Sequence, residues 1–137
     1  HRLQLRAAVN ESQIIDDTYN ANPASYKQAL TSMKAFSGEH WLVLGDFGEL
    51  GNESKSLHIK MGQDAKKSGI TRLFAIGENS QYAAQSFGEG AVHIKDIYVL
   101  QQQLQKELSN GITCLIKGSR FMQLDKLADV LAEEGKG

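Results

Sequence analysis

Short apolar runs alternate with segments of helical periodicity along almost the whole chain. The runs at 41–44, 73–76 and 112–116 are too short for helices and apolar enough for strands covered on both faces. Between and after them, apolar residues recur at helical spacing, most clearly over 124–131. Strands separated by helices require crossover connections. The sequence therefore predicts an α/β fold with a doubly wound, mostly parallel sheet flanked by helices.

Capping and turn residues set the limits of the other expected elements. Asn22 followed by Pro23 is typical of a helix start, and Gly69 of a helix end. Further strands are expected at 3–9, 13–17 and 91–94, and further helices at 22–36, 57–68, 81–87 and 97–108. A frayed tail is expected from Glu133.

Length and charge narrow the class of protein. With 137 residues, 41% of them hydrophobic, residues 1–137 form one domain with an ordinary core. Fifteen basic residues against sixteen acidic ones give no general attraction for nucleic acid or an anionic membrane, and no apolar run approaches the roughly 18–20 residues of a membrane span. The single Cys114 suits a reducing compartment, so a cytoplasmic location is expected. The start at His1 resembles a cut inside a longer polypeptide.

Ligands in such sheets bind beyond the carboxyl ends of the strands, so the loops there are the candidate sites. The first loop, 16–23, reads Asp-Asp-Thr-Tyr-Asn-Ala-Asn-Pro. A carboxylate can accept ribose hydroxyls, a tyrosine ring can lie against a base, and a carboxamide can bond a purine edge. The alternative is structural: Asn22 caps the helix and the aspartates belong to the turn.

The second loop, 45–51, combines three glycines with Asp46 and Glu49. Glycines let the backbone approach a ligand, and the two acids could hold a cation or an ammonium group. The alternative is a mobile surface loop. Neither a GxxxxGK[ST] nor a GxGxxG pattern occurs, so the sequence lacks the usual loop for binding a nucleotide triphosphate.

The third loop, 117–120, reads Lys-Gly-Ser-Arg and precedes the last expected helix. Two cations at a helix N-terminus favour a carboxylate or phosphate, whereas the structural alternative is that Ser119 caps the helix. His58 could reach the ligand of the second loop, although a lone helical histidine is more often a packing or surface residue. The remaining histidines and Cys114 show no metal-ligand spacing.

Together, the segments 16–23, 43–51 and 117–120 closely resemble the C-terminal domain of the Mur ligases, and the resemblance covers essentially the whole chain. It implies the third domain of a three-domain enzyme whose other domains bind a UDP-sugar and carry the P-loop. It also implies ATP- and Mg²⁺-dependent amide-bond formation, in which an acyl phosphate of UDP-N-acetylmuramoyl-tripeptide is attacked by D-alanyl-D-alanine. ATP and Mg²⁺ would be held mainly by the central domain, so this chain by itself is expected to be inactive.

The resemblance also implies roles for single residues. Asp17 would contact the ribose, with Tyr19, Asn20 and Asn22 near the adenosine. The residues expected to face the dipeptide are Asp46 and Glu49 at its amino end, and Lys117, Ser119 and Arg120 at its carboxylate or the developing charge.

Two other classes of protein remain as alternatives. A receiver-like signalling domain also places acids after early strands and a lysine after a late one, as Asp17, Asp46 and Lys117 do here. However, receivers usually begin with the acidic strand and have proline after the lysine, where this chain has Gly118. An interaction module with the same fold would leave the three polar loops unexplained.

Overall fold

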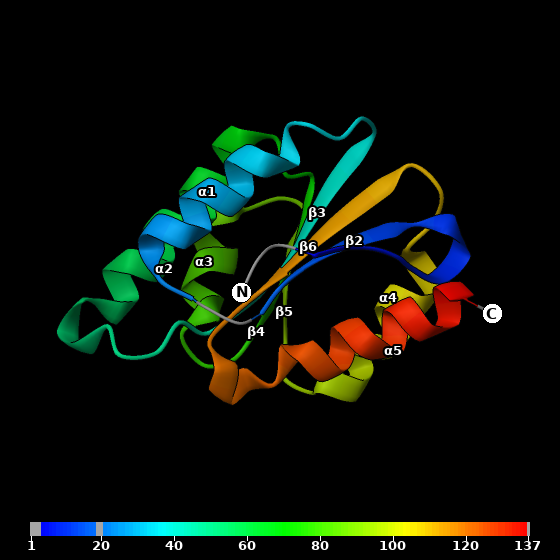
Figure 1. Cartoon of the computed structure of the whole chain (residues 1–137). Helices are drawn as coiled ribbons and strands as arrows, with labels where there is room; N and C mark the ends of the chain where they lie inside the picture. Colours follow the sequence, from blue (N-terminus) through cyan, green and yellow to red (C-terminus); the bar gives the residue numbers. More distant parts are fainter. Residues whose placement is uncertain (1–3, 19–20, 137) are drawn as a thin grey trace.

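A six-stranded, mostly parallel sheet forms the centre of the molecule in the computed structural model, which describes residues 4–18 and 21–136 (Figure 1). The strand order is β1-β2-β6-β3-β4-β5, and only β1 runs antiparallel to its neighbour. The strands are β1 (Gln4–Ala7), β2 (Gln13–Asp17), β3 (Glu39–Gly45), β4 (Arg72–Ile76), β5 (Ala91–Ile94) and β6 (Ile112–Lys117). The predicted fold class is confirmed.

Five α-helices cover the two faces of the sheet. They are α1 (Pro23–Met33), α2 (Ser54–Ser68), α3 (Ser80–Phe87), α4 (Ile97–Glu107) and α5 (Leu124–Lys136). In Figure 1, α1, α2 and α3 lie on one side of the strands, and α4 and α5 lie on the other. Among the described residues, no helix is both long and apolar enough to cross a membrane.

Alternate strand residues supply the two halves of the core. Leu42 points toward Tyr26 of α1 and Met61 of α2, whereas its neighbour Val43 belongs with Leu100 of α4 and Leu127 of α5. All six side chains are almost completely buried. This alternation explains why the central strands read as continuous apolar runs: both of their faces are covered.

Several element boundaries differ from the sequence prediction; helix α2, for example, begins at Ser54 rather than Leu57. The strand expected over 3–9 is shorter because Val9–Glu11 forms a 3-10 turn, in which Asn10 donates to the carbonyls of Gln105 and Leu108 at the end of α4. Helix α1 ends at Met33 rather than Phe36. Helix α5 continues to Lys136, so the expectation of a frayed tail from Glu133 was wrong. Tertiary packing, which periodicity alone does not capture, decides such ends.

The order of the strands separates this fold from a receiver domain. Flavodoxin-like sheets, which receivers share, have the order 2-1-3-4-5. Here the parallel strands β2, β3, β4, β5 and β6, numbered one to five along the chain, are arranged 1-5-2-3-4. The receiver-like alternative is therefore not supported by the topology.

Candidate functional site

The three polar loops meet at the carboxyl edge of the sheet because the strands before them are neighbours. Strand β6 lies between β2 and β3, and its last residue, Lys117, is in register with Asp17 on one side and Leu44 on the other. Each loop leaves the sheet at the same edge. The structure thus brings together the segments that the sequence marked separately.

A buried ion pair lies at the base of this edge. The Lys117 ammonium donates to Oδ2 of Asp17 at 2.7 Å. The lysine side chain is 0% exposed and the aspartate side chain 14% exposed. A lysine removed completely from water needs a charged or strongly polar partner. The residue expected to face ATP and the residue expected to face the dipeptide are therefore in direct contact.

The other described polar residues of the first loop have structural partners. Asp16 accepts from Arg6 at 3.1 Å and from Thr18 at 2.8 Å. Asn22 caps α1 through a reciprocal capping box with Ser25, as the structural alternative for this residue predicted. Tyr19 and Asn20 lie outside the described residues.

Asp46, at the end of β3, faces the start of α3. Its two carboxylate oxygens accept the backbone N–H groups of Asn79 at 3.0 Å and Ser80 at 2.7 Å, and the residue is 6% exposed. A carboxylate at a helix N-terminus satisfies amides that have no partner within the helix. At Gly77, with φ of +112°, an added Cβ would lie 2.5 Å from Oδ1 of Asp46, so glycine permits this approach.

Two side chains hold the glycine-rich second loop. His58 is completely buried; its Nε2 accepts from the N–H of Phe47 at 3.1 Å, and its Nδ1 lies 2.7 Å from the carbonyl of Ser54. This pattern requires the neutral ring with the proton on Nδ1. From the third loop, Oγ of Ser119 accepts the N–H of Gly48 at 2.6 Å. His58 therefore positions the loop, and Ser119 joins two loops instead of capping α5.

Glu49 and Arg120 are the exposed charged members of the site. Glu49 has φ of +61°, a left-handed conformation that is costly for a residue with a Cβ and that concentrates at functional sites. Arg120 begins a 3-10 turn, Arg120–Met122, directly after Ser119. The two charges of opposite sign stand on separate loops, which suits a ligand with charges at both ends.

Gly118 permits close packing of β6 against β3. An added Cβ at Gly118 would lie 2.9 Å from Cδ1 of Leu124 and 3.0 Å from Cα of Gly45. Gly45 itself meets Leu124 and Met122 in the same way. Gly118 is buried by its neighbours, so it serves the packing of the two strands.

Neither a metal site nor a reactive thiol is present in the described part of the chain. Across residues 4–18 and 21–136, no three His, Cys, Asp or Glu side chains cluster as metal ligands would. Burial raises the pKa of the Cys114 thiol to about 12, so its thiolate is unavailable at neutral pH.

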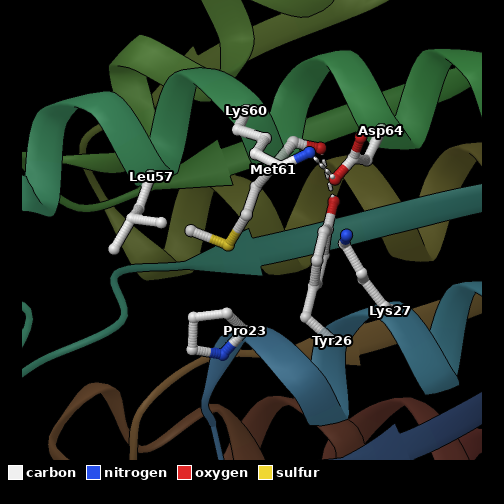
Figure 2. Close-up of a pocket in the computed structure, with 7 residues that line it drawn as sticks. All are labelled: Pro23, Tyr26, Lys27, Leu57, Lys60, Met61 and Asp64. Atoms are coloured by element: carbon white, nitrogen blue, oxygen red, sulfur yellow. Dashed lines mark hydrogen bonds and ion pairs between the residues drawn. The ribbon is translucent and has the colours of Figure 1, made fainter.

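A small apolar pocket lies between the start of α1 and the middle of α2. It has a volume of about 120 Å³. Figure 2 shows its lining: Pro23, Tyr26, Lys27, Leu57, Lys60, Met61 and Asp64. The Tyr26 hydroxyl donates to the Met61 carbonyl at 2.7 Å, and Lys60 pairs with Asp64 at 3.6 Å. None of the predicted site residues lines the pocket.

Comparison with known proteins gives one consistent assignment. Residues 1–120 match the family described as "Mur ligase, glutamate ligase domain". The chain is 35% identical over 124 residues to the UDP-N-acetylmuramoyl-tripeptide–D-alanyl-D-alanine ligase of Escherichia coli K12, a match that covers 89% of this chain and 27% of that protein.

Solved structures give the same fold. A MurF structure from Acinetobacter baumannii superposes with a TM-score of 0.81 at 29% identity, and MurF from Thermotoga maritima in complex with ADP superposes with 0.82 at 21% identity. Each match covers 96% of this chain and 30% of the other. The chain thus spans about three tenths of the length of the relatives it matches. These matches, together with the sheet and its three loops, show that the chain belongs to the Mur ligase family as a C-terminal, glutamate ligase domain.

Proposed function

We propose that this chain is the third domain of an ATP-dependent ligase that joins D-alanyl-D-alanine to UDP-N-acetylmuramoyl-tripeptide in peptidoglycan precursor synthesis. The Escherichia coli relative carries that activity in its name, and a structural neighbour holds ADP. The ligase would be a cytoplasmic enzyme. Since this chain contains no phosphate-binding loop, the triphosphate would be held by the central domain of the full enzyme.

The reaction would proceed in two steps. The tripeptide carboxylate attacks the γ-phosphorus of ATP, which gives an acyl phosphate and ADP. The amine of the dipeptide then attacks the acyl carbon, inorganic phosphate leaves, and loss of a proton from nitrogen gives the amide. The role of this domain is to bring the amine to the acyl phosphate and to close over the site, which lowers the barrier by orientation.

The buried Lys117–Asp17 pair is the observation that best supports this role. It links the loop proposed to face ATP with the loop proposed to face the dipeptide, so closure over one substrate would orient the groups for the other. In this proposal Asp17 contacts the ribose, and the Lys117 charge lies beneath the developing negative charge. Tyr19, Asn20 and Asn22 are proposed to lie near the adenosine.

The exposed charges on the other two loops fit the two ends of a dipeptide. Glu49 is proposed to receive the ammonium group, and Arg120 with Ser119 the carboxylate. The side-chain oxygens of Asp46 are occupied by the start of α3. Asp46 is therefore proposed to contribute to dipeptide binding indirectly, by positioning the second loop, to which it belongs. Mg²⁺ does not fit the described residues, which offer no cluster of acidic ligands, so it would be bound elsewhere in the enzyme.

A phosphate-release assay on the full-length parent enzyme tests the proposal. With UDP-N-acetylmuramoyl-tripeptide, ATP and Mg²⁺ present, phosphate release should depend on D-alanyl-D-alanine. Lys117→Ala and Asp17→Ala should reduce kcat/KM by about 100-fold or more, the scale of losing an electrostatic group at a reaction centre. Arg120→Ala, at an exposed position, should raise KM for the dipeptide without unfolding the protein.

Lys106→Ala is the matched control, since this exposed lysine lies near the end of α4, at the opposite edge of the sheet. It should leave kcat/KM unchanged. Circular dichroism and thermal unfolding would separate loss of activity from loss of folding. Phosphate release by a folded wild type that does not depend on the dipeptide would overturn the proposal.

A further inference from the structure

Phe121 is a large apolar side chain that the fold does not use for its own core. It is 65% exposed, although it follows Arg120 directly at the carboxyl edge of the sheet. Exposed aromatic surface contributes little to the stability of a domain, because the gain from burial scales with the area removed from water. A single exposed apolar side chain is common on a protein surface, so the position of Phe121 beside the polar loops, and not its exposure alone, is the observation that matters.

The backbone beneath the ring is fixed in place. The Met122 N–H donates to the Ser119 carbonyl at 2.9 Å, and the Gln123 N–H donates to the Arg120 carbonyl at 3.0 Å. Met122 and the following Leu124 pack against Gly45. The turn that carries Phe121 is thus closed by hydrogen bonds and anchored to the end of β3.

The ring also lies against the second polar loop. An added Cβ at Gly48 would be 3.0 Å from Cε1 of Phe121 and 3.6 Å from Oγ of Ser119. The absence of a side chain at Gly48 lets one part of the ring approach the backbone, and the rest of the ring remains open to solvent. Phe121 thereby forms an apolar wall between the loop that bears Glu49 and the turn that bears Arg120.

We infer that Phe121 is a specificity-determining residue that contacts the methyl group of the C-terminal D-alanine of the incoming dipeptide. This inference rests on the proposed function. The dipeptide has an ammonium group, a carboxylate and two methyl groups, so polar receptors alone cannot distinguish alanine from glycine. The carboxylate and the terminal methyl share one carbon atom, and the proposed carboxylate receptor, Arg120, is the direct neighbour of Phe121. An aromatic face is a suitable apolar surface for a methyl group.

The test crosses a protein variant with a substrate variant in the full-length parent enzyme. Wild type and Phe121→Ala are each assayed for phosphate release with D-alanyl-D-alanine, D-alanyl-glycine and glycyl-D-alanine. A methyl contact is worth about tenfold in kcat/KM. For wild type, kcat/KM should therefore be about tenfold lower with D-alanyl-glycine than with D-alanyl-D-alanine. For Phe121→Ala, kcat/KM with D-alanyl-D-alanine should be about tenfold lower than for wild type, and it should fall little further with D-alanyl-glycine. Phe121→Leu, which retains apolar surface, should recover most of the discrimination.

Tyr98→Ala is the control, because Tyr98 is 70% exposed but belongs to the first turn of α4, which follows the edge strand β5. It should leave the preference between the three dipeptides unchanged. An equal loss in Phe121→Ala for all three dipeptides, as expected of a contact between domains, would overturn the inference alone. If Phe121→Ala instead lost the discrimination against glycyl-D-alanine, the assignment to the terminal methyl would be overturned. No dependence of wild type on any dipeptide would overturn the proposed function as well.

Discussion

Both edges of the sheet carry an ion pair, but the two pairs differ in how far they are buried. At the carboxyl edge, Lys117 is completely buried against Asp17. At the amino edge, Arg72 forms an ion pair with Glu107, the two side chains remain 31% and 33% exposed, and the guanidinium lies over Trp41 and Phe74. Arg72 can keep its charge partly hydrated while its body covers aromatic surface.

At the carboxyl edge the fold keeps an arrangement that does not maximise stability. Apolar residues of similar volume often replace a buried ion pair without loss of stability, so its presence is weak evidence for a stabilising role. The amino edge has the arrangement expected of a structural surface. The carboxyl edge instead holds a charge at a fixed position, completely out of water.

The largest expected effect is the loss of stability when the buried ion pair, rather than the exposed one, is broken. Lys117→Met leaves Asp17 without its partner and should lower the free energy of unfolding by about 3–5 kcal/mol. Arg72→Met, at the exposed pair, should cost under about 1 kcal/mol. Urea denaturation of the two variants measures both. The double variant Lys117→Met with Asp17→Asn should recover much of the loss, and equal costs for the two single variants would contradict the comparison.

The second effect concerns Asp46, the buried acid that fixes the start of α3 at the carboxyl edge of the sheet. Asp46→Ala leaves the part-buried N–H of Asn79 and the buried N–H of Ser80 without an acceptor and should cost about 2–3 kcal/mol. Hydrogen exchange at the amides of Asn79 and Ser80 should accelerate, as measured by nuclear magnetic resonance. Asp96→Ala provides the control, because Asp96 caps α4 at an exposed position through the N–H of Tyr98 and should cost about 1 kcal/mol. Unchanged exchange at Ser80 would show that Asp46 does not hold α3.

The third effect tests the internal support of the glycine-rich loop. His58→Leu keeps the buried volume but removes the acceptor for the Phe47 N–H, and should cost about 1–2 kcal/mol. Since the loop carries Glu49, KM for the dipeptide in the full-length enzyme should rise more than kcat falls. His58→Gln, which can still offer an acceptor, should restore part of both losses. A folded His58→Leu enzyme with wild-type KM would show that the loop needs no such support.

The smallest effect is a pH dependence at the amino edge. The hydrogen bond from Arg72 holds the pKa of Glu107 below its ordinary value of 4.5, so the folded state favours the charged carboxylate. The stability that this ion pair contributes is fully present above the pKa of Glu107 in the unfolded chain, and it is lost as the pH falls through the pKa of Glu107 in the folded protein. Glu107→Gln should therefore lower Tm slightly at pH 7, and the difference should shrink as the pH is lowered and the carboxylate becomes protonated. A difference that grows on acidification would contradict the assigned direction.

Much of the fold could be predicted because its signals are local. Apolar runs identified the central strands, and Asn22 with Pro23 identified the start of α1, as the capping box confirms. The ends of elements were less accurate, since the 3-10 turn after β1 exists because Asn10 reaches carbonyls of α4 nearly a hundred residues away. No window of sequence contains both partners of such a contact.

The alternation of strands and helices, the three polar loops and the resemblance to the Mur ligases could all be read from the sequence, because each depends on residues that are close together in the chain. The partners of the polar groups could not: Lys117 pairs with Asp17, Ser119 bonds to Gly48, Asp46 holds α3, and Phe121 remains exposed. These contacts depend on the order of the strands. Placing β6 between β2 and β3 brings distant loops to one edge, and this order is fixed by packing on both faces of the sheet.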